Sequence, residues 1–204
     1  MKTNLSKRQS EIINAAIRII GEGGIQALTI KNLSTEIGIV ESALYRHFKS
    51  RTEIIETLLD SIKEDVTSIY TGVSQSKKSS FARIKDLIDF QLDTFSTNPS
   101  FAIVILSDGL YKNEVNLRNK IYEIMEFAKE TFIGIIEDGK NLGEIRKDIP
   151  SDQMAFVIMG SVRLMVNQWS LAGFNFDLKK RGKFLTKTIS TLIQNEVSLK
   201  SKIL

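Results

Sequence analysis

The stretch that decides the fold is residues 28–55, LTIKNLSTEIGIVESALYRHFKSRTEII. Thr29 can cap a short helix that ends at Gly38, because glycine readily takes the left-handed conformation of a tight turn. A second short helix then follows to about His47, and a longer helix comes directly after it. Two short helices around a glycine turn are the sequence pattern of a helix-turn-helix.

The second short helix is expected to have an apolar and a polar side. At about 100° per residue, Leu44 points into the core with Val40 and Phe48 on its side, so Ser42 and Arg46 lie opposite. Hydroxyl, guanidinium, phenol and methyl groups on such a face are those that contact base edges in the major groove of DNA. The candidate residues for base and phosphate contacts are Thr29, Lys31, Glu41, Ser42, Ala43, Tyr45, Arg46, His47, Lys49 and Arg51.

Two of these residues have a second interpretation. Glu41 can accept a hydrogen bond from a cytosine amine, but a carboxylate at this point also simply favours the N-terminus of its helix. His47 is the only histidine of the chain. A catalytic base would also need a nucleophile and an orienting acid, so a phosphate or core-edge contact is the simpler role.

The charge is distributed unevenly along the chain. The formal net charge is +4, and residues 1–51 carry eight Lys and Arg against four acidic residues, which leaves the remainder neutral. A basic N-terminal part on a neutral body suits a module that faces a polyanion such as DNA. The run KKRGK at residues 179–183 is interpreted as a solvated helix end, with a nucleic-acid contact as the alternative.

The composition excludes much of enzyme chemistry. No cysteine is present, so disulfides, thiolate catalysis and sulfur-bound zinc are excluded, and one histidine cannot build a multi-histidine metal site. We therefore expect no catalytic residue, metal site or cofactor, and a helical enzyme remains only a remote alternative. The longest apolar runs have six residues, against roughly 18 for a membrane span. With no signal-like N-terminus, a cytoplasmic protein without membrane contact is expected.

Apolar residues recur mostly at three- and four-residue spacing, which predicts an all-α fold of about nine helices. The run FAIVIL at residues 101–106 could form a buried strand, but nothing else in the chain offers it a partner. The helix beginning at Ser50 is expected to turn Ile54, Ile55, Leu58, Leu59, Ile62, Val66 and Ile69 inward. The expected helices cover about 6–20, 30–37, a short segment to 47, 50–71, 81–97, 100–110, 115–140, 152–172 and 177–197. The expected domains are a three-helix DNA-binding domain over 1–50 and a helical ligand-binding and dimerisation domain over 51–204.

The helix-turn-helix stretch resembles the TetR family of transcriptional regulators, whose signature has the form T-x-x-x-[IL]-A-x-x-x-G-V-S-x-x-x-[LI]-Y-x-[HY]-F-x-x-K-x-x-L. The matching positions here are Thr29, Leu33, Ser34, Gly38, Ile39, Val40, Leu44, Tyr45, His47, Phe48, Arg51 and Ile54. Val40, Ser34 and Arg51 stand where the signature has Ser, Ala and Lys. The recognition helix therefore lacks a side-chain N-cap worth about 1 kcal/mol. Arg51 keeps the charge for a phosphate but changes its geometry.

The resemblance implies a homodimer that binds a palindromic operator and is released by a small molecule in the C-terminal domain. Family dimers usually pair their last two long helices, here about 152–172 and 177–197. Apolar residues nearly surround the first of these helices, so one chain cannot cover all of its circumference. Phe156 and Trp169 are the candidate interface residues.

The effector site is expected among the helices between about 81 and 140 and the adjoining helix 152–172. The candidate ligand-binding residues are Phe90, Phe95, Met125, Phe127, Met159, Arg163 and Asn167. This set suits a mostly apolar effector with one polar or anionic end, although each aromatic residue is more simply a core residue and Arg163 more simply a member of an ion pair, within the chain or at the dimer interface. The predicted function is a ligand-responsive regulator, most simply a repressor; the alternative is a DNA-binding regulator controlled by a protein partner or without an effector.

Overall fold

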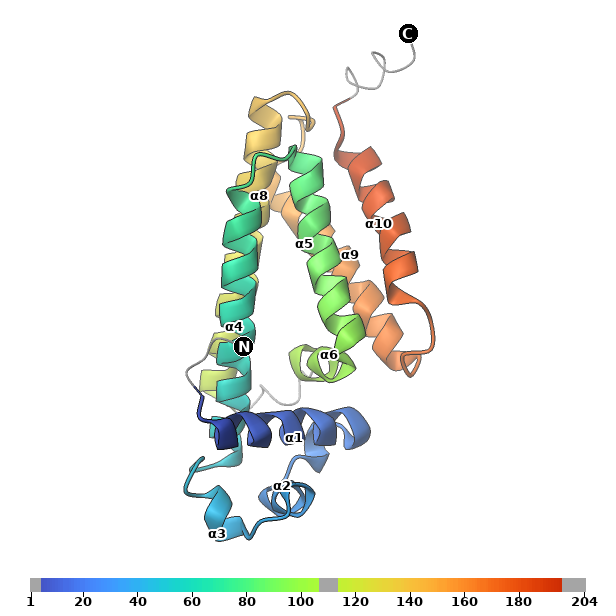
Figure 1. The fold of residues 1–204 in the computed structure, drawn as a ribbon. Coiled ribbons are helices and arrows are strands. Elements are labelled where there is room, and N and C mark those ends of the chain that lie inside the picture. The colour runs from blue at the N-terminus through green and yellow to red at the C-terminus, as the bar shows by residue number, and fades with distance from the viewer. Residues whose placement is uncertain (1–4, 107–113, 196–204) are drawn as a thin grey trace. The chain divides into compact units, whose positions relative to one another are not determined.

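The computed structural model describes residues 5–106 and 114–195, and Figure 1 shows the helices that they form. Within these ranges there are nine α-helices, which confirms the all-α fold of about nine helices. A short 3₁₀ turn, Ile25–Ala27, follows the first helix. The helices are α1 Lys7–Gly23, α2 Ile30–Ile37, α3 Glu41–Leu44, α4 Arg51–Ser74, α5 Ser80–Thr97, α6 Pro99–Ile105, α8 Val115–Asn141, α9 Ser151–Leu171 and α10 Leu178–Ile193.

The ambiguous apolar run at residues 101–106 is helical through Ile105, as expected, but the helix ends there with Leu106 as its C-cap and does not continue as predicted. It lies in α6, which begins with Pro99 in its first turn, where the missing N–H of proline costs no hydrogen bond. The last helix ends earlier than predicted, because Gln194 has extended backbone and the Arg146 N–H donates to the Ile193 carbonyl. Predicted helix ends at 107–110 and 196–197 lie outside the described residues.

Packing divides the chain into two compact units. The first comprises Met1–Thr67 and Asn98–Ile124, and the second comprises Ser68–Thr97 and Met125–Leu204. The unit that holds the helix-turn-helix is therefore larger than the expected domain of residues 1–50, because it also includes most of α4, all of α6 and the beginning of α8. Helices α4 and α8 each contribute to both units.

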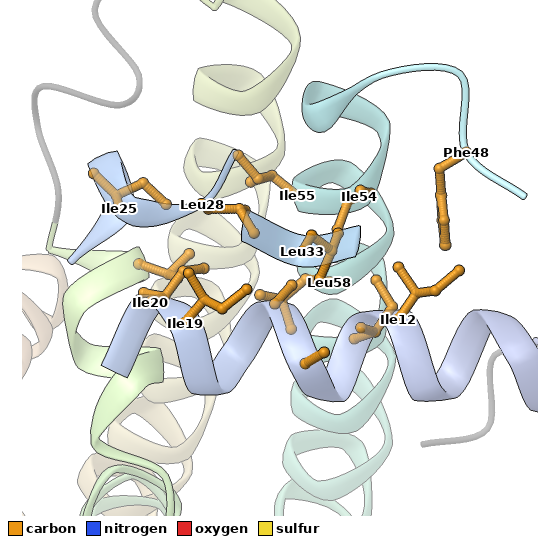
Figure 2. Close-up of a cluster of buried hydrophobic side chains, with 14 of the residues drawn as sticks. Ile12, Ile19, Ile20, Ile25, Leu28, Leu33, Phe48, Ile54, Ile55 and Leu58 are labelled. Atoms are coloured by element: carbon orange, nitrogen blue, oxygen red, sulfur yellow. The ribbon is translucent and has the colours of Figure 1, made fainter. Parts of the chain in front are cut away.

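The core of the first unit is built mainly from isoleucine and leucine side chains of α1, the 3₁₀ turn, α2 and α4 (Figure 2). Leu33 of α2, Leu44 of α3 and Ile12 of α1 have no exposed surface, and Phe48 after α3 is 2% exposed. Burial of one such side chain stabilises the fold by about 1.5–3 kcal/mol. These contacts hold the two short helices of the helix-turn-helix against α1 and α4.

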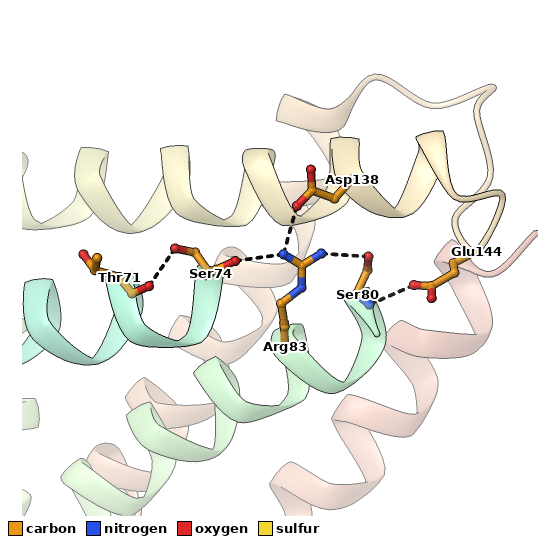
Figure 3. Close-up of polar contacts among 6 residues, drawn as sticks. All are labelled: Thr71, Ser74, Ser80, Arg83, Asp138 and Glu144. Atoms are coloured by element: carbon orange, nitrogen blue, oxygen red, sulfur yellow. Dashed lines mark hydrogen bonds and ion pairs between the residues drawn. The ribbon is translucent and has the colours of Figure 1, made fainter. Parts of the chain in front are cut away.

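In the second unit, Arg83 of α5 joins three chain segments (Figure 3). Its side chain is buried, and its guanidinium donates to the Ser74 carbonyl and to the Asp138 carboxylate, both at 2.9 Å, and to the Ser80 hydroxyl at 3.3 Å. The Ser80 N–H in turn donates to the Glu144 carboxylate at 2.8 Å. The ends of α4 and α8 are thereby fixed to the beginning of α5.

One inward prediction for α4 is wrong. Ile69 is 40% exposed, whereas the next residue, Tyr70, is 1% exposed. The inward stripe in the first unit includes Leu58 and Leu59, and Tyr70 lies in the second unit, where α4 has different neighbours. Tyr70 lies about 20° from Leu59 around the helix, so this side of the stripe stays buried at the end of α4 while the side of Ile69 does not.

Candidate nucleic-acid interface

The helix-turn-helix forms locally as its sequence predicts. The Thr29 hydroxyl accepts a hydrogen bond from the Asn32 N–H at 3.0 Å, which caps α2. Gly38 ends the helix with φ 74° and ψ 39°, the left-handed conformation that favours glycine. The turn at Gly38 therefore connects α2 directly to α3.

Helix α3 is shorter than expected and its start is uncapped. Val40 occupies the N-cap position without a side-chain hydrogen bond, and only Glu41–Leu44 is α-helical before a turn reaches His47. Val40 has extended backbone and is 68% exposed, so the expectation that it shares the buried side of Leu44 is wrong. A residue outside the helix does not follow the helical 100° spacing.

Most of the predicted DNA-facing side chains of α3 and of the turn after it are exposed. Tyr45 is 49% exposed, and Leu44 beside it is fully buried, so the helix has the expected two sides. Ala43, His47 and Arg51 are half-buried. The exposed members of the predicted set are Thr29, Lys31, Glu41, Ser42, Tyr45, Arg46 and Lys49.

The cationic groups of this surface are available for an anion. Across residues 5–106 and 114–195, no carboxylate forms an ion pair with Lys31, Arg46 or Lys49. Glu41 lies in the first turn of α3, where its charge favours the helix N-terminus. Such a surface can place cations against phosphates and present Arg46 and Ser42 to base edges. These contacts remain predictions.

Arg51 differs from the other candidates. Its Nη2 donates to the backbone carbonyl of Ile25 at 2.8 Å, and its Nε is buried without a hydrogen-bond partner. The predicted phosphate contact stays a prediction, but the structure gives this side chain a contact within its own chain that the sequence did not indicate.

The chain leaves α3 through a defined connection. The Ser50 hydroxyl accepts a hydrogen bond from the Glu53 N–H at 3.1 Å, as in the predicted capping box. The Glu53 carboxylate accepts from the Lys49 N–H, one residue before the position that the motif assigns. These two hydrogen bonds therefore cap the start of α4.

In the second unit, two of the predicted ligand residues, Phe90 and Phe127, contact Tyr70. Tyr70 was not among the residues predicted from the sequence. The Tyr70 ring contacts Phe90 edge-on at 6.2 Å and Phe127 at 6.4 Å between ring centroids, and Phe132 at 6.1 Å completes the group. The Tyr70 hydroxyl accepts a hydrogen bond from the Gln91 amide at 2.5 Å. Burial raises the pKa of Tyr70 well above its ordinary value, and the smaller effect of Gln91 lowers it. We call Tyr70, Phe90, Phe127, Phe132 and Gln91 the aromatic cluster.

The other predicted ligand residues have mixed environments. Phe95, Met159 and Arg163 are half-buried, and Met125 is 38% exposed. Asn167 is exposed on the outer side of α9. The structure therefore brings Phe90 and Phe127 into contact with the same residue, Tyr70, but shows no such contact for Asn167.

Helix α9 carries a largely apolar outer face, with half-buried Arg163 at its edge. Phe156 is 72% exposed and Leu164 is 58% exposed, and Gly160 between them is exposed with nothing within 4 Å of where a side chain would begin. Asn167 and Leu171, 81% exposed, continue the same face. Helix α10 packs beside α9 (Figure 1) and adds exposed Phe184 and Leu192. We call these α9 and α10 residues, with Val157, the apolar outer face.

Trp169 does not contribute an exposed side chain to this face. It is 5% exposed, its indole N–H donates to the Phe176 carbonyl at 2.9 Å, and its ring contacts Phe174 at 4.8 Å. Phe174 has a positive φ of 61°, which this contact and the turn after α9 hold in place. Trp169 therefore anchors the connection between α9 and α10 of its own chain.

The described part of the chain holds neither a candidate metal site nor a candidate membrane-spanning helix. No group of three or more histidine, cysteine or acidic side chains there is arranged to hold a metal ion. None of its helices combines the length and the hydropathy that a bilayer crossing requires.

A helix-turn-helix with an exposed polar reading face, followed by a larger set of helices, defines a DNA-binding regulator. Two family models match this chain. The model described as bacterial regulatory proteins, tetR family, matches residues 12–58, and the model described as YsiA-like protein, C-terminal region, matches residues 52–195. The chain therefore belongs to the TetR family of transcriptional regulators, as the signature indicated.

Proteins similar to this chain in sequence include nucleoid occlusion factors of two bacteria. The nucleoid occlusion factor SlmA of Haemophilus influenzae (strain PittGG) is 26% identical over 137 residues, which are 67% of this chain and 63% of that protein. SlmA of Vibrio atlanticus (strain LGP32) is 27% identical over 178 residues, 85% of this chain and 89% of that protein. The match to the Haemophilus protein thus spans less than two thirds of its length.

A solved structure gives the same fold at lower identity. The transcriptional regulator FadR from Bacillus subtilis, in complex with stearoyl-CoA, superposes with a TM-score of 0.75 at 20% identity and covers 93% of this chain and 100% of that chain. This similarity shows the fold alone.

Proposed function

We propose that the protein is a homodimeric, ligand-responsive transcriptional repressor without enzymatic activity, which binds a palindromic operator. The observation that carries the proposal is the apolar outer face. Its α9 part combines Phe156, Leu164 and Leu171, all more than half exposed, and the one charged residue between them in the sequence is half-buried Arg163. A continuous apolar surface of this kind is typical of an interface that a second copy covers.

A two-fold dimer accounts for operator recognition. Two α3 helices, one from each copy, can read two half-sites of a palindrome if they lie about 34–36 Å apart, the distance between successive major grooves on one side of DNA. Arg46 and Ser42 are the base-reading residues in this proposal, and Lys31, Lys49 and Thr29 contact phosphates.

The aromatic cluster is the proposed effector site. It offers three phenylalanine rings for an apolar ligand and two polar groups, the Tyr70 hydroxyl and the Gln91 amide, for one polar end. A ligand that binds the DNA-free form more tightly than the DNA-bound form lowers operator affinity, and a difference of about 1–3 kcal/mol is sufficient.

The test is a titration of a preformed protein–operator complex. The operator is selected from a random duplex pool by the wild-type protein, and the probes are a long-chain fatty acid, stearoyl-CoA and triclosan. At least one probe class is expected to weaken binding by about 5–150-fold. The variant Phe127→Ala should lose this response while keeping operator affinity, and Tyr122→Ala, at an exposed position of the same helix, is the matched control. A response to no probe contradicts the ligand part of the proposal.

A second candidate function follows from the relatives. Both SlmA proteins are named nucleoid occlusion factors rather than ligand-responsive repressors, and the alternative function is a DNA-binding regulator that a protein partner controls. Co-purification of a protein with the operator-bound chain, together with no effect of any small molecule, would favour this candidate.

A further inference from the structure

We infer that Arg51 is a positioning residue of the DNA-binding unit: it joins the two ends of the helix-turn-helix and thereby fixes α2 and α3 for base reading. The inference rests on the DNA-binding function of the chain and is independent of the proposed effector. All the residues concerned lie in the first unit.

The hydrogen bond from Arg51 to Ile25 connects two points that flank the whole motif. Ile25 lies in the 3₁₀ turn, four residues before Thr29, the cap of α2. Arg51 is the first residue of α4, three residues after Phe48, whose ring closes the core below α3. The bond spans 26 residues and closes the segment that contains both short helices.

The short helices depend on such external support. Helix α2 has eight residues and α3 has four, and helices of this length are not stable alone because nucleation is costly. The N-cap of α3, Val40, adds no side-chain hydrogen bond. The orientation of the reading face therefore depends on the core below it and on how the two ends of the motif are held.

The entry to the motif is otherwise a sharp bend. Gly24 has φ 72° and ψ 178°, a backbone conformation that other residues rarely adopt, and it separates α1 from the 3₁₀ turn. The Ile25 carbonyl accepts hydrogen bonds from the Leu28 N–H at 3.3 Å and from the Arg51 guanidinium at 2.8 Å. Arg51 thus supplies the contact that ties this bend to α4.

The environment of the guanidinium fits a positioning role. The Arg51 side chain is half-buried, and its Nε is removed from solvent without a hydrogen-bond partner. A side chain that only presented charge to a phosphate would keep its N–H groups in water, as exposed Lys49 does. The planar fork of arginine can hold a carbonyl in a fixed direction, which the flexible ammonium of lysine does less well.

The experiment compares wild type, Arg51→Ala, Arg51→Lys and Lys49→Ala, each shown to be folded by circular dichroism at the assay temperature. Affinity for the selected operator and for a random duplex is measured from 50 to 300 mM salt. Lys49→Ala is expected to weaken both duplexes and flatten the slope of log K against log salt by about one. Arg51→Ala and Arg51→Lys should each reduce the ratio of operator affinity to random-duplex affinity by about tenfold, because misplaced reading residues lose base contacts worth about 1–3 kcal/mol. Arg51→Ala should leave the salt slope unchanged.

Each other outcome overturns the inference. Equal weakening of both duplexes with a flatter slope for Arg51→Ala, and full rescue by Arg51→Lys, would make Arg51 a phosphate contact. If the folded Arg51 variants keep both the operator-to-random affinity ratio and the salt slope of wild type, Arg51 has only a structural role. If wild type shows no preference for the selected operator, the DNA-reading proposal itself fails. Amide hydrogen exchange in the free protein then tests the Arg51–Ile25 hydrogen bond separately. The backbone amides of residues 27–29 should exchange faster in Arg51→Ala than in wild type, and an unchanged exchange rate would contradict the positioning role of this bond.

Discussion

The Tyr70 hydroxyl accepts a hydrogen bond from the Gln91 side-chain amide inside a group of three phenylalanine rings. The contact joins α4 to α5 within the second unit, and Tyr70 is 1% exposed. A polar pair in such surroundings is favourable only while both partners are hydrogen-bonded and uncharged.

The ionisation of Tyr70 should lower stability at alkaline pH. Burial raises the pKa of Tyr70 above its ordinary value of about 10, so above pH 10 the unfolded chain releases a proton that the folded chain keeps. The stabilising contribution is complete below pH 10 and is lost progressively above it. Replacing Tyr70 by Phe should therefore reduce the fall in unfolding free energy between pH 9 and 11 by about 1 kcal/mol.

Urea denaturation at the two pH values measures this difference. Tyr122→Phe is the matched control, because Tyr122 is 62% exposed and has no such contact with a ring cluster. An identical pH dependence for wild type and Tyr70→Phe would show that Tyr70 ionises normally and is not buried as described.

Phe156→Asp should convert the dimer into a folded monomer. The substitution places a charge in the apolar outer face, where a partner would have to desolvate it. Light scattering coupled to size exclusion should give a mass near 23 kDa for the variant, against twice that value for wild type. Leu142→Asp, at a residue that is 70% exposed after α8, should remain dimeric. A wild-type mass near 23 kDa rules out the dimer.

Trp169→Asp should behave differently from Phe156→Asp. Trp169 is buried against Phe174 and the α9–α10 connection of its own chain, so a carboxylate there disrupts the fold itself. A loss of about 3–5 kcal/mol is expected, visible as a lower melting temperature or as aggregation. A Trp169→Asp variant that is monomeric with unchanged stability would instead place this residue at the dimer interface.

Arg83→Met should destabilise the second unit without affecting base reading. The substitution preserves much of the side-chain volume but removes the hydrogen bonds to Ser74, Asp138 and Ser80. At about 1 kcal/mol each, the loss is about 2–4 kcal/mol. Arg118→Met, at an exposed position of α8, controls for the loss of charge. Equal urea midpoints for both variants would contradict the joining role of Arg83.

Local rules were enough to predict the helix-turn-helix from the sequence. Thr29 as a cap, Gly38 as a left-handed residue and Leu44 and Phe48 as buried residues all depend on neighbours within a few positions. The prediction for Val40 was wrong because it extended helical spacing to a residue that lies before the helix. Arg51 was interpreted only by its charge, since nothing local indicates a hydrogen bond to a residue 26 positions away.

The second unit was less predictable because burial there also depends on contacts between residues that are far apart in the sequence. Tyr70 was missed because its burial depends on which helices contact the far end of α4, and apolar spacing alone favoured Ile69. Phe156 and Trp169 looked equivalent in a helix that is apolar nearly all round. Only tertiary packing separates them, because one contacts its own chain and the other remains exposed.

Reading of DNA by the outward side of α3 is the central claim, and the sequence discrimination of Arg46→Ala tests it most directly. Affinities for the selected operator, for operators with each base pair changed in turn, and for a random duplex should be measured at one salt concentration, with Arg118→Ala as the charge-matched control. The account predicts that Arg46→Ala loses about 1–3 kcal/mol of discrimination at one base pair of each half-site, while Arg118→Ala keeps it. An operator-to-random ratio that is the same in Arg46→Ala as in wild type would contradict the account.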